Sequence, residues 1–157
     1  MSAPALLEHV VTTDDAAGTR ALAARLAAAA RPGDLLCLRG GLGAGKTQFA
    51  KGFAAGLDVR ETVSSPTFVL MAEYDGRLPL FHLDLYRLAD AADVLAGGLL
   101  DDRQVTGVVL VEWAERLGPA LPAARLDVLI DGLGEEPRRI TLRTAAEAYR
   151  RYLELAA

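Results

Sequence analysis

The stretch Gly40-Gly41-Leu42-Gly43-Ala44-Gly45-Lys46-Thr47 matches the pattern G-x-x-x-x-G-K-[ST]. A loop of this kind directs a ring of backbone N–H groups at phosphate oxygens, and side chains at most of its positions would block that approach. Some positions also need a positive φ angle, which glycine adopts without strain. The stretch therefore predicts a phosphate-binding loop, or P-loop, from Gly40 to Thr47.

The last two residues of the loop predict how a nucleotide and its metal would be held. Lys46 supplies a compact cation for the β and γ phosphates, and the Thr47 hydroxyl can ligate Mg²⁺. The apolar run at 35–38 is typical of a strand covered on both faces. Residues 46–57 suit a helix whose N-terminus faces the same anion. A glycine turn without a ligand is the alternative, and these flanking elements argue against it.

Two acidic residues each follow a short apolar run, as expected at the end of a buried strand. Asp84 follows the run 80–83, and Glu112 follows the run 108–111. Open α/β sheets bind ligands at the carboxyl ends of their strands, and a P-loop site needs an acid there for Mg²⁺ or its water. One acid would approach the metal while the other orients the attacking water, and the sequence leaves open which is the direct ligand. A solvated carboxylate is the alternative for either one alone.

Three neighbouring features each allow two interpretations. His82 lies on an expected strand, where a packed and hydrogen-bonded residue is favoured over a catalyst. Trp113 follows Glu112 and is either a core residue or an exposed aromatic that serves a partner or a nucleotide. The segment Ser64-Ser65-Pro66-Thr67-Phe68 lies where nucleotide switches sense a γ-phosphate. A plain helix-to-strand turn is the alternative for this segment.

The order of predicted elements indicates one α/β domain over residues 1–157, with a P-loop NTPase fold and a mixed, mainly parallel central sheet flanked by helices. A helix is expected at 14–30 and another, short, at 90–96. Strands at 67–74 and 78–85 would form a hairpin at Asp75-Gly76. Strands at 126–130 and 139–142 would form a second hairpin around Gly134. Thr144 and Glu147 have the spacing of a capping box for a last helix.

Composition and charge restrict the class of protein further. Apolar residues make up 52% of the 157-residue chain, and the formal net charge of −4 argues against a broad basic surface that binds nucleic acid unaided. Cys37 is the only cysteine and lies in an apolar run, so a buried thiol is expected. Because no apolar run approaches the ~20 residues of a bilayer span and no signal peptide is evident, we expect a cytoplasmic protein with no membrane partner.

Several of these motifs occur in an order that resembles a known family. The order is G-L-G-A-G-K-T at 41–47, S-P-T-F at 65–68, H-L-D-L-Y-R-L at 82–88 and V-E-W at 111–113. It is similar to the bacterial TsaE (YjeE) family, which acts in the biosynthesis of threonylcarbamoyladenosine in tRNA. The resemblance extends from about residue 14 to residue 142, with 143–157 as a variable C-terminal helix.

The resemblance implies a P-loop ATPase that uses ATP and Mg²⁺ and acts with TsaB and TsaD on adenosine 37 of tRNAs reading codons that begin with A. The tRNA would be reached only through that complex. By position, Asp84, Lys46 and Trp113 would be catalytic, and Thr47, Glu112 and Asp84 would serve the metal. The nucleotide would contact residues 40–47 and Arg138 or Arg139, with residues 12–19 near the adenine. Ser65 and Thr67 would belong to a switch loop.

Two departures from the family and two rival functions remain. Gly41 stands where the family commonly has Asp, and Ala114 stands where it commonly has Pro after the tryptophan. A small-molecule kinase is one rival function, but such kinases usually have an arginine-bearing lid, and 97–108 contains only Arg103. A regulatory nucleotide switch without a catalytic role is the second, because slow turnover and switching use the same parts.

Overall fold

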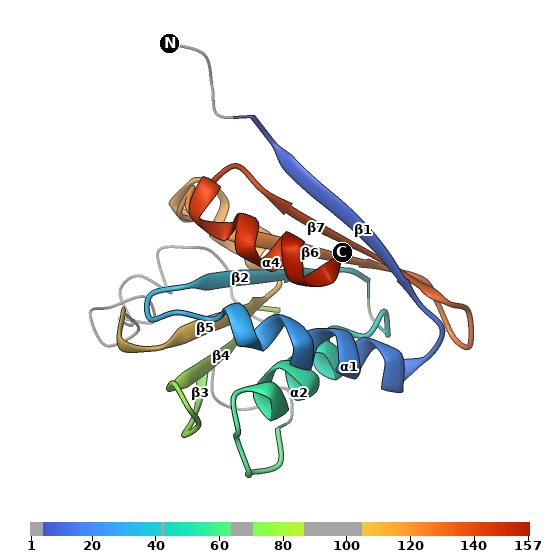
Figure 1. The fold of residues 1–157 in the computed structure, drawn as a ribbon, viewed down its shortest axis with the longest axis horizontal. Coiled ribbons are helices and arrows are strands. Elements are labelled where there is room, and N and C mark those ends of the chain that lie inside the picture. The colour runs from blue at the N-terminus through green and yellow to red at the C-terminus, as the bar shows by residue number, and fades with distance from the viewer. Residues whose placement is uncertain (1–4, 42, 64–70, 87–104) are drawn as a thin grey trace.

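The computed structural model describes residues 5–41, 43–63, 71–86 and 105–157. Seven strands in these residues form one sheet with the order β1-β7-β6-β2-β5-β4-β3 (Figure 1). Their bounds are β1 Leu7–Thr13, β2 Leu35–Arg39, β3 Met71–Tyr74, β4 Leu80–Asp84, β5 Val108–Glu112, β6 Leu126–Asp131 and β7 Arg138–Thr144. The chain therefore has the α/β fold with a mixed sheet that the sequence predicts.

Parallel pairing is confined to the centre of the sheet. β6, β2, β5 and β4 pair in parallel, whereas β1–β7, β7–β6 and β4–β3 are antiparallel. β2, β4 and β5 are apolar and buried almost throughout, because strands in the middle of a covered sheet meet side chains on both faces. The carboxyl ends of these three strands consequently meet at one edge, next to the glycine loop.

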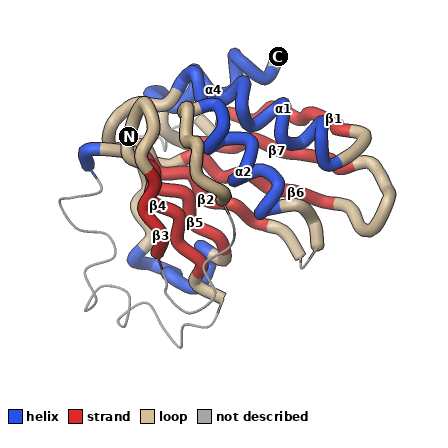
Figure 2. Tube along the Cα trace, turned by 90° about the horizontal axis from the view of Figure 1, so that it is seen from below, coloured by secondary structure: helices blue, strands red, loops and turns tan. Residues whose placement is uncertain are grey.

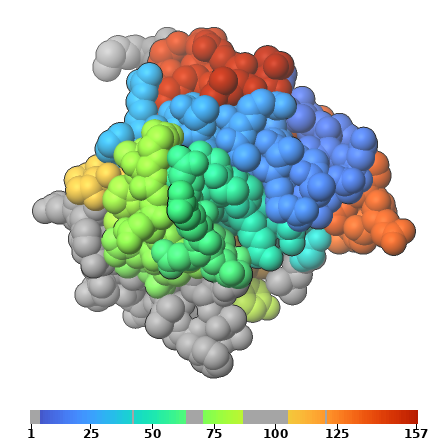
Figure 3. Space-filling model, turned by 60° about the horizontal axis from the view of Figure 1, so that its bottom comes forward, coloured from blue at the N-terminus to red at the C-terminus, as the bar shows by residue number. Residues whose placement is uncertain are grey.

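Among the described residues, three α-helices cover one face of the sheet: α1 Ala16–Leu26, α2 Lys46–Gly56 and α4 Arg150–Ala156 (Figure 2). The Asp15 side chain caps α1 by accepting a hydrogen bond from the Gly18 amide at 2.7 Å. α1 lies between α2 and α4 in the space-filling view (Figure 3). A Cβ on Gly52 would collide with the carbonyl oxygen of Arg20, so glycine allows α1 and α2 to approach closely.

The opposite face carries a second, smaller core. Ala114 and Leu117 of the 3₁₀ helix η3 (Ala114–Ala120) pack there with Cys37, Phe81 and other side chains of β2, β4 and β5. Cys37 is fully buried, and burial raises the pKa of its thiol to about 12. The buried core thiol expected from the sequence is confirmed.

Most sequence-predicted elements in the described residues are confirmed, including both hairpins and the helix at 14–30, which is α1 followed by the 3₁₀ helix η1 (Ala27–Ala29). The short helix expected at 90–96 lies outside the described residues. β1 was not predicted, although alternate residues along it are partly buried. As an edge strand with one partner, β1 carries a weak apolar signal, and its place depends on pairing with β7.

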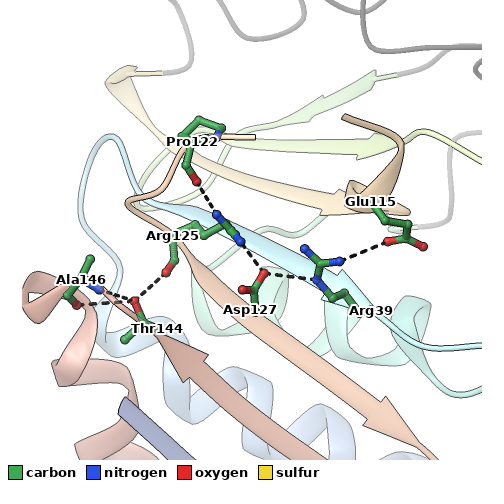
Figure 4. Close-up of polar contacts among 7 residues, drawn as sticks. All are labelled: Arg39, Glu115, Pro122, Arg125, Asp127, Thr144 and Ala146. Carbon is green, nitrogen blue, oxygen red and sulfur yellow. Dashed lines mark hydrogen bonds and ion pairs between the residues drawn. The ribbon is translucent and has the colours of Figure 1, made fainter. Parts of the chain in front are cut away.

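The capping box predicted for Thr144 and Glu147 is wrong. Thr144 ends β7, and its hydroxyl accepts a hydrogen bond from the Ala146 amide and donates one of 2.6 Å to the Arg125 carbonyl (Figure 4). The 3₁₀ helix η4 (Glu147–Tyr149) and α4 begin without a side-chain cap, and Glu147 pairs with Arg150. The Thr144 hydroxyl therefore joins the end of β7 to the residue before β6. The spacing of Thr144 and Glu147 does not reveal this contact.

A buried carboxylate joins α4 to the start of β2. Asp34 is 6% exposed and accepts hydrogen bonds from the Tyr152 hydroxyl at 2.6 Å, from the Arg31 amide at 3.0 Å and from Arg151. Burial and the bond to Asp34 raise the pKa of the Tyr152 hydroxyl. Since a buried carboxylate needs such partners, Asp34 ties the C-terminal helix to the sheet.

We expect Tyr152→Phe to lower the free energy of unfolding by about 1.5–3 kcal/mol, the range for a hydrogen bond to a charged group. Urea unfolding should show a lower midpoint with an unchanged slope. Arg150→Ala is the matched control, because it removes an exposed ion pair with Glu147 and should change stability by less than about 0.5 kcal/mol. Equal midpoints for Tyr152→Phe and the wild type would contradict the role given to Asp34.

Candidate functional site

The predicted glycine loop lies between β2 and α2, and tight backbone packing holds it. A Cβ on Gly40 would lie 2.6 Å from the carbonyl oxygen of Ile130 on β6, so only glycine fits there. Gly45 caps α2 with a φ of 116°, in the region that side chains disfavour. The helix α2 thus begins at the loop. The exposed N–H groups at its N-terminus attract anions. Leu42 lies outside the described residues.

The Lys46 side chain folds back over the loop. Its Nζ donates hydrogen bonds to the carbonyl oxygens of Gly40 at 2.5 Å and Gly41 at 3.3 Å. It also lies 4.1 Å from the centre of the Trp113 ring, a cation–π contact. Burial lowers the pKa of Lys46, and the negative charges of Glu112, Glu115 and Asp84 oppose that shift. The ammonium group is therefore held at the mouth of the loop, close to carboxylates.

The two predicted carboxylates are direct neighbours in the sheet. Asp84 ends β4, Glu112 ends β5, and the parallel register pairs the two residues. Both line a pocket of about 320 Å³ together with Lys46 and Thr47. Asp84 is half-buried and accepts a hydrogen bond from the Tyr86 amide at 3.0 Å, whereas Glu112 is 3% exposed. Each acid ends a buried strand, as the sequence predicts, and the register brings the two together at one edge of the sheet.

Trp113 combines the two interpretations that the sequence left open. Its ring is half-buried, packs against the smaller core and lines the pocket. Its φ of 61° lies in the left-handed region, which is rare for a bulky residue and occurs where the surrounding structure imposes it. Tyr86, to which no role was assigned from the sequence, packs against it with ring centres 4.9 Å apart and the ring planes tilted by 48°. The sequence feature that could have pointed to Tyr86 was its place in the motif H-L-D-L-Y-R-L at 82–88.

A second pocket, also of about 320 Å³, adjoins the other side of the loop. Its lining comes from the start of α1, the loop and the β6–β7 connection, including Asp15, Thr19, Gln48 and Arg138. Arg138 donates hydrogen bonds to the carbonyl oxygens of Ala44 at 2.8 Å and Gly134 at 2.9 Å. Of the two arginines considered from the sequence, Arg138 lines this pocket and Arg139 does not.

Charged side chains connect the strand before the loop to the helix after Trp113. Arg39, the last residue of β2, contacts Asp127 of β6 at 3.3 Å and Glu115 of η3 at 3.8 Å (Figure 4). Arg125 contacts the same Asp127 carboxylate at 3.1 Å. These partly exposed pairs contribute little to stability individually, but they join the elements that carry the loop and Trp113.

The donor chemistry at the first pocket fits Mg²⁺. Thr47 offers a hydroxyl oxygen, and Asp84 and Glu112 offer carboxylate oxygens, the ligands of a hard cation. In the part of the chain that the structure describes, no three His, Cys, Asp or Glu side chains gather into a metal site. Mg²⁺ in proteins keeps several waters and is held by one or two carboxylates plus substrate phosphates. The predicted switch residues Ser65 and Thr67 lie outside the described residues.

The glycine loop between a buried parallel strand and a helix, with acids at the ends of the adjacent strands, defines a P-loop protein of the α/β class. The family model for threonylcarbamoyl adenosine biosynthesis protein TsaE matches residues 13–140. The chain belongs to this family.

Individual relatives agree with the family assignment. The tRNA threonylcarbamoyladenosine biosynthesis protein TsaE of Bacillus subtilis is 47% identical over 83% of this chain and 82% of its own length. The protein of the same name from Streptomyces coelicolor is 39% identical over 83% of this chain and 93% of its own. The crystal structure of Bacillus subtilis YdiB superposes with a TM-score of 0.79 at 38% identity, covering 97% of this chain and 95% of that one.

None of the helices in the described residues has the length and hydrophobicity that a membrane span requires.

Proposed function

We propose that this chain binds Mg²⁺–ATP and hydrolyses it slowly, in support of a TsaB–TsaD complex that forms threonylcarbamoyladenosine at position 37 of tRNAs reading codons that begin with A. One observation carries the ATPase part: Lys46, Thr47 and the paired acids Asp84 and Glu112 line a single pocket. The pathway and the partners rest on membership of the TsaE family.

The loop amides and the N-terminus of α2 would bind the phosphates, and Lys46 would neutralise charge on the β and γ groups. Its Nζ donates two of its three hydrogens to the Gly40 and Gly41 carbonyls, which leaves one for a phosphate oxygen. Trp113 would keep the ammonium near the pocket through the cation–π contact. Binding would therefore add a phosphate contact to those that Lys46 already makes within the loop.

Thr47 and Glu112 would hold the Mg²⁺, which neutralises charge on the phosphates when bound. Asp84 is the better candidate for the residue that orients the attacking water and takes up its proton. It is half-buried and reached by the solvent of the pocket, whereas Glu112 is almost fully buried. This assignment divides the two roles that the sequence left open between the two acids.

The second pocket would take the adenine. It adjoins the same loop, so one nucleotide can occupy both pockets, with its phosphates at Lys46 and its base near Thr19 and Arg138. Adding candidate hydroxyl substrates to an ATPase assay tests the kinase alternative directly: a phosphorylated product would support it.

Glu112→Gln should weaken the binding of ATP in the presence of Mg²⁺ and leave binding in EDTA unchanged, because a neutral amide is a poorer Mg²⁺ ligand than a carboxylate. We expect a loss of about 10-fold or more in calorimetry with Mg²⁺, the effect of removing a charge-assisted contact. Glu115→Gln is the matched control, since this exposed neighbour does not line the pocket. Equal losses with and without Mg²⁺ would remove Glu112 from the metal site.

A further inference from the structure

His82 and Glu112 form a buried pair that the proposed roles leave unexplained. His82 is fully buried, Glu112 is 3% exposed, and His82 Nε2 lies 2.6 Å from Glu112 Oε2. The register places His82 opposite Leu110, so Glu112 is its diagonal neighbour on the same face of the sheet. Imidazole and carboxylate therefore meet directly beneath the pocket that Glu112 lines.

The surroundings of the imidazole specify how the pair is bonded. Among the described residues, Nδ1 of His82 is buried without a hydrogen-bond partner. A buried N–H donor without a partner is costly, and a neutral imidazole carries its one proton on either nitrogen. The proton therefore lies on Nε2, which donates to the Glu112 carboxylate. His82 thus holds one oxygen of Glu112 through a single charge-assisted bond.

Packing alone does not account for a histidine at this position. The neighbours of His82 on this face, Leu80 and Leu110, are fully buried leucines of the main core. A leucine would fill such a site without leaving a polar nitrogen unpaired, whereas a buried imidazole costs free energy that only a partner offsets. The partner here is the acid at the end of β5.

We propose that His82 is a positioning residue for Mg²⁺: by holding Oε2 it fixes the orientation in which Glu112 meets the metal. This inference rests on the proposed function, because it assumes that Glu112 serves the metal. Hydrogen-bond partners behind a metal ligand typically contribute 10–100-fold to metal affinity. His82 touches neither nucleotide nor metal and acts only through Glu112.

The test compares His82→Leu, which removes the donor, with His82→Gln, whose side-chain amide can still donate. Binding of a non-hydrolysable ATP analogue is titrated with Mg²⁺ and separately measured in EDTA. We expect His82→Leu to raise the Mg²⁺ concentration for half-maximal binding by about 10–100-fold, with no change in EDTA, and His82→Gln to stay close to the wild type. A general loss of structure would reduce binding in EDTA as well.

A double-mutant cycle separates this inference from the proposed function. In a Glu112→Gln background, His82→Leu should have no further effect on the Mg²⁺ requirement. If the wild type shows no Mg²⁺-dependent binding, the proposed function fails. A second outcome is that the wild type does show Mg²⁺-dependent binding, Glu112→Gln abolishes that dependence and a folded His82→Leu keeps the wild-type Mg²⁺ requirement. That outcome would refute only the positioning role.

A measurement on the wild type covers the case in which His82→Leu does not fold. The chain has two histidines, so the imidazole nitrogen resonances can be assigned by NMR with a His9 variant. Mg²⁺ added to the nucleotide-bound protein should shift the His82 Nε2 resonance, and it should not do so in Glu112→Gln. A His82 resonance that ignores Mg²⁺ in the wild type would overturn the proposal.

Discussion

Asp84→Asn should leave ATP binding close to that of the wild type and lower the rate of hydrolysis by at least about 100-fold, the usual contribution of a general base. The asparagine carbonyl can still accept the hydrogen bond from the Tyr86 amide that Asp84 accepts at 3.0 Å. It cannot take up a proton from water, so the local fold is kept and the chemistry is lost. Calorimetry for binding and single-turnover hydrolysis for the rate provide the two measurements.

Asp131→Asn is the matched control for this experiment, because Asp131 is an exposed acid at the end of β6 that does not line either pocket next to the loop. It should hydrolyse ATP at the wild-type rate. The same pair of variants tests the coupling to tRNA. In a reconstituted system with TsaB and TsaD, repeated cycles of modification should stop with Asp84→Asn and continue with Asp131→Asn. Sustained cycling with Asp84→Asn would mean that hydrolysis is not coupled to modification.

Lys46→Ala should weaken ATP binding by about 10- to 150-fold, which corresponds to the roughly 1.5–3 kcal/mol of a hydrogen bond to a charged group. The lost contact is the one between the ammonium and the phosphates, since Lys46 already lies at the mouth of the loop. Calorimetry at fixed Mg²⁺ measures the change, and circular dichroism checks that the variant is folded.

The only other lysine supplies the control for Lys46→Ala. Lys51 lies on the same helix but lines a different cavity, away from the loop. Lys51→Ala should therefore bind ATP as the wild type does, although it changes the net charge equally. Wild-type affinity in a folded Lys46→Ala would exclude the phosphate contact.

The P-loop and the elements on either side of it were determined by the sequence alone. The glycines at 40, 43 and 45 and the pair Lys46-Thr47 are local requirements of a turn that exposes its amides. The apolar runs that become β2, β4 and β5 carry the signal of strands buried on both faces. Both hairpins followed from turn residues. These features depend on neighbours in the chain, so they can be read without a structure.

Only the tertiary structure decided how the site is assembled. The register of β4 on β5 sets Asp84 beside Glu112 and brings His82 to the same carboxylate. Trp113 adopts its left-handed conformation where the ring meets Lys46 and Tyr86. These arrangements depend on contacts between segments far apart in the chain. If β4 paired with β5 one residue out of register, the side chains of His82 and Asp84 would point to the other face of the sheet. The sequence around these residues would be unchanged, so it does not reveal the register.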